Sequence, residues 1–164
     1  MLTQASVAHA AVDIQGMSAA QKVALADEIF IQQPNLLASI LVLPRMGVDM
    51  TQLEVPIHIL LVTFQAMKLS GHAWPVVTED MQDGCMQRLT ARMRFNEGLS
   101  PELANGLVQQ FCDEHPERYL LAFVYGYLGE HDLLSARTEA EKFLMLAVFN
   151  LVECVALVGA ASPS

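Results

Sequence analysis

Residues that start and stop helices recur along this chain at an offset of 82 positions. The matched markers are Gly16 with Gly98, Ser18 with Ser100, Pro34 with Pro116, and Gly47 with Gly129. Ser caps the free amides at a helix start, Pro fits the first helical turn, and Gly tolerates the left-handed turn after a helix end. The spacing therefore predicts an internal repeat, with one copy over residues 1–77 and a second over residues 78–164.

Apolar residues recur at helical spacing between these markers in both copies. We predict helices in the first copy over residues 3–14, 19–32, 35–46 and 53–69. In the second copy we predict helices over residues 79–95, 101–114, 117–128 and 137–159. No two-residue hairpin turn separates alternating runs, so strands are not expected. The sequence predicts an all-α helical bundle of about seven to eight helices, built from two tandem four-helix units with pseudo-twofold symmetry in one compact domain, 1–164.

The last helix of each copy is the most apolar. In residues 137–159 the polar side chains form one narrow stripe: Glu139, Lys142, Asn150 and Glu153. A helix that is apolar around most of its girth has to be surrounded by other elements. The helix over 53–69 has the same design, with Glu54 and His58 on its polar side. We expect these two helices to meet at the centre of the molecule, on the pseudo-twofold axis.

Residues 143–161 are interrupted only by Asn150 and Glu153, and their length nearly spans a bilayer. An ionisable residue near the middle of a membrane helix costs about 2.5 to 3.5 kcal/mol on insertion scales. We therefore interpret this segment as a buried helix and not as a membrane span. The apolar surface of so short a chain predicts a second subunit that covers part of it, and hence a homodimer.

Charge and cysteine usage narrow the classes of partner. The 18 acidic and 9 basic residues give a net charge of −9, which repels nucleic-acid phosphates, so no nucleic-acid partner is expected. Three cysteines without a C-x-x-C pair suit a reducing compartment. The N-terminus has neither the basic nor the apolar region of a signal peptide. We predict a cytoplasmic protein.

Motifs for catalysis or metal binding are missing from the sequence. The five histidines show neither E-x-x-H nor H-x-x-x-H spacing, and the doublet His131–Asp132 is interpreted as a polar turn. No phosphate-binding loop or nucleophile motif occurs, and Cys85, Cys112 and Cys154 have no local base. The sequence therefore predicts no catalytic residue, no metal and no cofactor, and an enzyme is the less favoured class.

Two features are candidates for binding a partner. Arg88, Arg92 and Arg94 form a basic island in an acidic chain, and guanidinium groups match carboxylates and phosphates. The helix dipole also accounts for basic residues near a helix end. Trp74, in the segment that joins the two copies, either anchors a partner or fixes that segment to the core.

Two functional hypotheses follow, and a third, less favoured one is a membrane-associated protein anchored by residues 143–161. The first is a non-catalytic helical interaction or scaffolding protein, homodimeric, that binds a protein or peptide in a groove between the two copies. The alternative is a protein or enzyme that binds a small ligand or metal at the pseudo-twofold axis, through Glu54, His58, Asn150 and Glu153.

Overall fold

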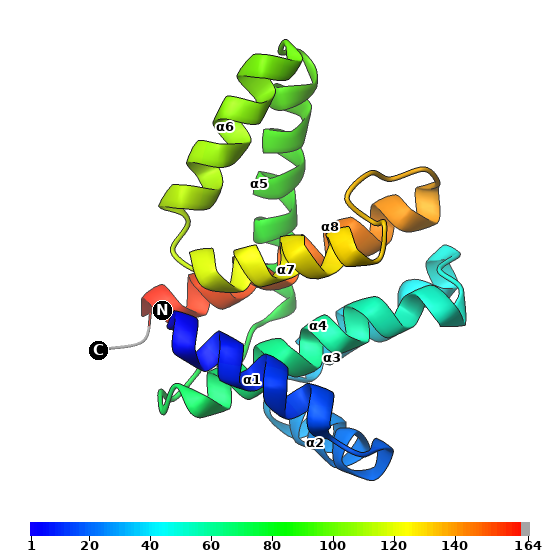
Figure 1. Ribbon diagram of the computed structural model, residues 1–164, viewed down its shortest axis with the longest axis vertical. Helices are drawn as coiled ribbons and strands as arrows, with labels where there is room; N and C mark the ends of the chain where they lie inside the picture. The colour runs from blue at the N-terminus through cyan, green and yellow to red at the C-terminus, as the bar shows by residue number, and fades with distance from the viewer. Residues whose placement is uncertain (162–164) are drawn as a thin grey trace.

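The computed structural model describes residues 1–161, and in that range the chain is helical without strands (Figure 1). The elements are α1 (Gln4–Gly16), α2 (Ala19–Gln32), α3 (Pro34–Leu41), the short 3-10 helix η1 (Leu43–Met46), α4 (Met50–Leu69), α5 (Glu79–Glu97), α6 (Pro101–Glu114), α7 (Arg118–Glu130) and α8 (Glu139–Ala161). The predicted all-α helical bundle is confirmed. The final residues of the predicted domain, 162–164, lie outside the described range.

Capping residues set several of the boundaries that the sequence predicts. The Ser18 hydroxyl accepts the Gln21 N–H at 3.2 Å at the start of α2, and the Ser100 hydroxyl accepts the Leu103 N–H at 3.3 Å at the start of α6. These two helices span the predicted residues. The helix predicted over 35–46 instead divides into α3 and η1, because Pro44 has no N–H and its ring clashes with a continuing α-helix.

The glycine markers differ in conformation. Gly47 ends η1 with a φ of 96°, whereas Gly129 lies inside α7. The left-handed residue after α7 is Asp132, with a φ of 55°. The turn into α8 is accordingly longer than the turn into α4, and the matched glycines are not structurally equivalent.

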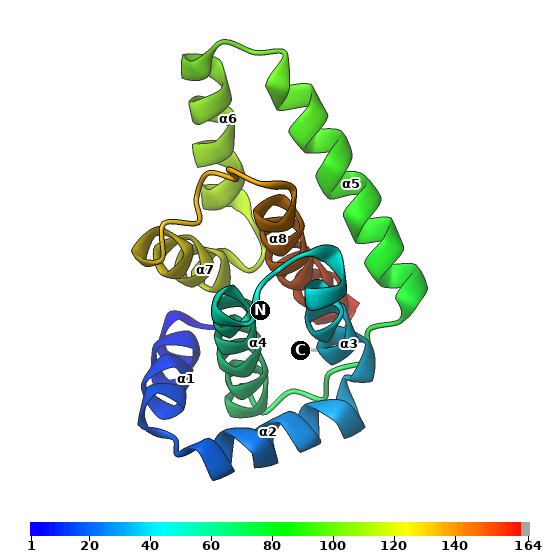
Figure 2. The ribbon, with the colours of Figure 1, turned by 90° about the vertical axis from the view of Figure 1, so that its right-hand side faces the viewer.

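Helices α4 and α8 occupy the middle of the fold. Helix α4 packs against α1, α2, α3, α7 and α8, and α8 packs against α3, η1, α4, α5 and α7 (Figure 2). Each of the two central helices contributes a long run of buried apolar side chains, such as Ile59 and Leu60 in α4 and Val152 and Val155 in α8. Helix α8 is also the one helix within residues 1–161 that is long and apolar enough to cross a bilayer, a property that core helices share.

The helices of the two halves of the chain pack in corresponding pairs, but the second half is less compact than the first. Helix α1 packs on α4 and α5 packs on α8, while α2 packs on α3 and α6 packs on α7. Helix α2 also rests on α4, but α6 has its main contact with α7 and contains no buried residue. Helices α5 and α6 therefore project from the bundle as an arm whose two helices are splayed apart (Figures 1 and 2).

Candidate functional site

An apolar groove opens between the arm and the bundle. We call it the arm groove, and its volume is about 330 Å³. It is lined by Leu89, Arg92, Met93 and Asn96 of α5, Val108 and Phe111 of α6, Leu121 and Tyr125 of α7, Leu134 and Ala136 of the following loop, and Lys142, Met145, Leu146, Phe149 and Glu153 of α8. Most of these side chains are apolar or aromatic, and the charged groups are few.

The sequence of α6 explains why the groove stays open. Its apolar residues Leu103, Leu107, Val108 and Phe111 lie on one side of the helix, at the spacing of an amphipathic helix. Only a part of this stripe meets the bundle. Leu103 remains 61% exposed and Leu107 39% exposed, and Phe95 near the end of α5 is 67% exposed. Contiguous apolar surface of this kind marks sites of interaction.

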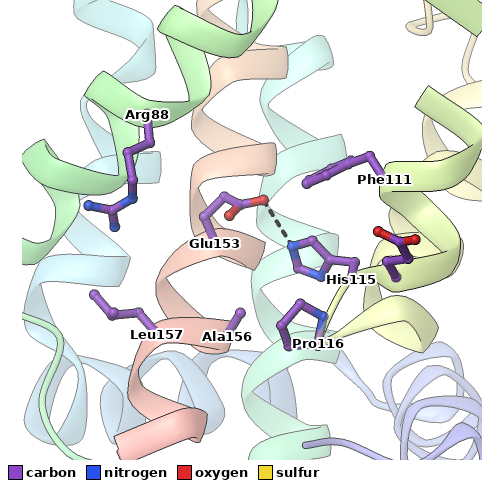
Figure 3. A pocket seen from close by; sticks show the side chains of 8 residues that line it. Arg88, Phe111, His115, Pro116, Glu153, Ala156 and Leu157 are labelled. Carbon is purple, nitrogen blue, oxygen red and sulfur yellow. Dashed lines mark hydrogen bonds and ion pairs between the residues drawn. The ribbon is translucent and has the colours of Figure 1, made fainter. Parts of the chain in front are cut away.

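A polar cluster formed by Arg92, His115 and Glu153 borders the arm groove. Glu153 Oε1 of α8 lies 2.9 Å from His115 Nε2 (Figure 3). The same oxygen lies 3.8 Å from Arg92 Nη1. The Arg92 guanidinium stacks over the Phe111 ring at 4.0 Å, and Phe111 meets the His115 ring edge-on. Arg92 Nη1 is buried and has no hydrogen-bond partner among the described residues. The cluster therefore connects α5, α6 and α8, and it leaves Arg92 Nη1 without a hydrogen bond in the described part of the chain.

The tautomer of His115 follows from its second contact. Its Nδ1 accepts a hydrogen bond from the backbone N–H of Glu117 at 3.0 Å, so the ring proton is on Nε2. The Nε2–H group therefore donates a hydrogen bond to the Glu153 carboxylate. Glu117 itself is 1% exposed and accepts the Leu2 N–H at 2.9 Å. Burial raises the pKa of the Glu117 carboxyl, and the Leu2 N–H partly opposes that shift.

A second, more open pocket of about 380 Å³ lies on the other side of the cluster (Figure 3). Arg88 borders it from α5, and Phe111, His115 and Glu153 face it from α6, the following turn and α8. The Arg88 guanidinium donates a hydrogen bond to the buried Cys85 Sγ at 3.3 Å. Of the predicted partner-binding arginines, Arg88 and Arg92 thus lie beside Glu153, while Arg94 is exposed in the last turn of α5.

Trp74 is half-buried and packs next to Gly159 of α8. Its indole N–H donates to the Met67 carbonyl and to the Ser70 hydroxyl, both at 3.0 Å. These contacts fix the segment between α4 and α5 to the end of α4. Trp74 lies away from the residues that line the arm groove.

Glu54 and His58 lie on the α7 side of α4 and not beside Asn150 and Glu153. The His58 ring stacks on Tyr127 with a centroid distance of 4.5 Å. Burial lowers the pKa of His58, and the positive charge of Lys22 lowers it further. The four predicted ligand residues therefore do not converge on one site at the α4–α8 contact.

Asn150 faces α5 and lines a third pocket, of about 410 Å³, between η1, α5 and α8. Its side chain is 6% exposed, and its Nδ2 donates to the Gln82 carbonyl at 3.1 Å. That contact fixes the orientation of the amide, and it leaves Oδ1 buried without a hydrogen-bond partner among the described residues.

No protein-family model, curated protein or solved structure matches this chain. Within residues 1–161 no group of three or more His, Cys, Asp or Glu side chains could hold a metal ion. Burial raises the pKa values of the Cys112 and Cys154 thiols, and it raises the pKa of Tyr125 to about 12. These groups are protonated at neutral pH, which makes the two thiols weak nucleophiles.

The sequence did not reveal the arm groove. Its aromatic lining residues Phe111, Tyr125 and Phe149 come from three helices, and helical periodicity assigns each of them simply to an apolar face. The one available signal was the apolar stripe of the helix predicted over 101–114. Periodicity shows that such a stripe exists but does not show whether the fold covers it.

Proposed function

We propose that this protein is a non-catalytic helical interaction protein, and that its arm groove binds an amphipathic α-helix of a partner protein. The observation that carries the proposal is that α6 contains no buried residue although Val108 and Phe111 of its apolar stripe line an apolar groove of about 330 Å³. Pockets for small molecules range from about 300 to 1,000 Å³ and are mostly apolar with a few polar groups, so a groove of this size can accept a few apolar side chains of a helix. A helix-in-groove complex uses such a surface.

The charges around the groove select the partner. The Arg92 side chain is 32% exposed and lies 3.8 Å from Glu153, and Lys142 on α8 is exposed and forms no salt bridge within residues 1–161. Glu153 is already engaged by His115 and Arg92. A helix that carries acidic residues beside its apolar face therefore complements the groove, and an acidic group would pair with Arg92 or Lys142.

The apolar contacts set the expected affinity. A partner helix that buries three leucine-sized side chains gains about 1.5 to 3 kcal/mol from each. Loss of translational and rotational freedom offsets at least about 4 kcal/mol of that gain, which leaves at most about 5 kcal/mol, so the apolar contacts alone support a dissociation constant of about 0.2 mM at best. The complex is expected to be reversible.

The proposal includes the tandem architecture. The two four-helix units, residues 1–77 and 78–164, would share one packing scheme, and the second unit would be the open copy because α6 does not rest on α8 as α2 rests on α4. The corresponding pairs α1–α4 with α5–α8 and α2–α3 with α6–α7 support this relation. The three free cysteines suit the proposed location in the cytoplasm.

Photo-crosslinking in the native cell tests the function. Benzoylphenylalanine replaces Met93 inside the groove or, as a matched control, Phe30, which is 66% exposed on α2. We expect an adduct from position 93 that maps to an apolar helix with acidic flanks of another protein. The substitution Met145→Asp in the groove should abolish this adduct, and Val23→Asp on α2 should leave it unchanged.

Three outcomes overturn the proposal: no adduct from position 93, equal adducts from positions 93 and 30, or an adduct that Met145→Asp does not affect. An adduct with a second copy of this chain alone also overturns it, because the groove would then serve only as a subunit interface. Circular dichroism verifies that each variant retains its helices.

The unpartnered Asn150 Oδ1 favours a second candidate function, the binding of a small apolar molecule that carries one hydrogen-bond donor. Indole and benzofuran have similar shapes, but only indole has an N–H. If this pocket is a ligand site, indole should bind more tightly than benzofuran in titration calorimetry, and Asn150→Leu should remove the difference. Equal affinities would exclude a role for Oδ1.

A further inference from the structure

Helix α6 has the two properties that we propose for a helix bound in the arm groove: an apolar face and acidic residues beside it. It is 14 residues long, carries acidic residues at its two ends, Glu102, Asp113 and Glu114, and contains no Lys or Arg. Its apolar stripe includes Leu103, which is 61% exposed, and Leu107, which is 39% exposed. The same chain therefore supplies an amphipathic, acidic helix that lacks a complete partner surface.

Helix α6 cannot fill the groove of its own chain. Residues 98–100 tie its start to α5 and residues 115–117 tie its end to α7, so both ends are fixed by short connections. It also forms one wall of the groove through Val108 and Phe111. Among the copies of α6, only that of another molecule can place its side chains in this groove.

We propose that the arm groove of one molecule receives α6 of a second copy, reciprocally, in a twofold-symmetric homodimer that a partner helix must open. This inference rests on the proposed function, because it names the resting occupant of the same groove. A twofold interface uses the same patch on both subunits. The two arms then form a four-helix arrangement with Leu103, Leu107 and Met93 of both copies in its interior.

Charge complementarity favours this occupant over an arbitrary apolar segment. The second half of α5 is basic, with Arg88, Arg92 and Arg94, whereas α6 is acidic. Within one molecule the two helices diverge, and the arginines and the α6 carboxylates do not form salt bridges with one another in the described part of the chain. In the dimer, α6 of one copy lies along α5 of the other, and opposite charges face each other.

The oligomeric state of the full chain tests the inference. Sedimentation velocity and light scattering at micromolar concentration should show a dimer. Because the interface is symmetric, Leu107→Glu introduces one charge and removes one buried leucine in each subunit. Each lost leucine raises the dissociation constant about tenfold, so the dissociation constant of the dimer should rise about a hundredfold or more. Leu103→Glu should act in the same direction. The matched control Val23→Glu, at a residue that is 62% exposed on α2, should leave the dimer intact.

Salt gives an independent readout. Because the basic half of α5 faces the acidic α6 of the other copy in the proposed dimer, raising the ionic strength should weaken the dimer, whereas a purely apolar interface would tighten or stay unchanged. Folding is not expected to confound the variants, since α6 has no buried residue, and circular dichroism verifies this.

A monomeric wild type overturns the homodimer, and so does a dimer that both Leu103→Glu and Leu107→Glu leave unchanged. A monomer that still gives the groove-specific adduct with another protein, lost in Met145→Asp, refutes the homodimer and leaves the proposed function standing. A dimer that dissociates with Leu107→Glu but gives no adduct to another protein refutes the proposed function and leaves the homodimer standing.

Discussion

Replacement of Asn150 by leucine should stabilise the protein, which is unusual for a buried position. Asn150→Leu removes the hydrogen bond to the Gln82 carbonyl, a net loss of about 0.5 to 1.5 kcal/mol. The Gln82 carbonyl lies inside α5 and keeps its helical N–H partner, so it is not left unsatisfied. The substitution also eliminates the buried, unpartnered Oδ1, which costs the native fold about 1 to 3 kcal/mol.

Apolar burial adds to this gain. A leucine in the same place contributes about 1.5 to 3 kcal/mol, and imperfect fit in the packed α5–α8 contact subtracts about 1 to 3 kcal/mol. Taken at their midpoints, these contributions increase the free energy of unfolding by roughly 1 kcal/mol. For a chain of this length that corresponds to a rise in Tm of about 3 °C in differential scanning calorimetry.

Gln33→Leu is the matched control, because it also replaces a buried amide side chain by leucine. In Gln33, however, both the amide NH2 group and the amide oxygen form hydrogen bonds. Gln33 donates to the Pro75 carbonyl at 2.8 Å and accepts the Val77 N–H at 2.9 Å. Its removal leaves the buried Val77 N–H without a partner and should lower the stability by about 1 to 3 kcal/mol. If Asn150→Leu destabilises the protein as much as Gln33→Leu does, the reasoning from the unpartnered oxygen is refuted.

Three further outcomes are expected. Phe64→Ala in α4 should lower the free energy of unfolding, measured with urea, by about 3 to 5 kcal/mol. Leu69→Ala, at an exposed position of the same helix, should lower it by less than about 1 kcal/mol. Similar losses for the two variants would contradict the central position of α4. Because burial raises the folded-state pKa of Glu117, its carboxyl stabilises the fold fully only below the unfolded pKa of about 4.3 and loses that contribution as pH rises through the folded pKa. The stability of Glu117→Gln relative to wild type should therefore increase over that window, and a constant difference would contradict this. Cys112 and Cys154 should react slowly with a disulfide reagent at neutral pH and rapidly after unfolding, since burial raises their thiol pKa values; fast reaction of the native protein would show an exposed thiolate.

The helices were predictable because local chemistry sets their ends. Ser18 and Ser100 accept amide hydrogens three residues ahead, an interaction that needs no tertiary contact. The start of α4 is three residues earlier than predicted because Asp49 accepts the Gln52 N–H at 2.7 Å, a cap that was overlooked in favour of later apolar residues. The division between α3 and η1 at Pro44 is also predictable from sequence, because a proline without an N–H interrupts the helical hydrogen bonds of its own turn.

The candidate site was only partly predictable. The basic island on residues 88–94 and the polar residue Glu153 were recognised in the sequence, but their meeting beside a groove was not. Arg92 and Glu153 are separated by 61 positions, and His115 completes their cluster from a third segment. The sequence also suggested one shared site for His58 and Asn150, which the structure places on different sides of the α4–α8 pair.

The sequence by itself determined the all-helical fold and most helix ends, because caps, prolines and apolar period act within a few residues. Only the tertiary structure decided that α2 rests on α4 while α6 stands away from α8, and therefore that one apolar stripe is covered and the other lines an open groove. The physical reason is that an amphipathic pattern fixes which face of a helix is apolar but not what packs against it. That choice depends on contacts between residues far apart in the chain, such as Arg92, His115 and Glu153.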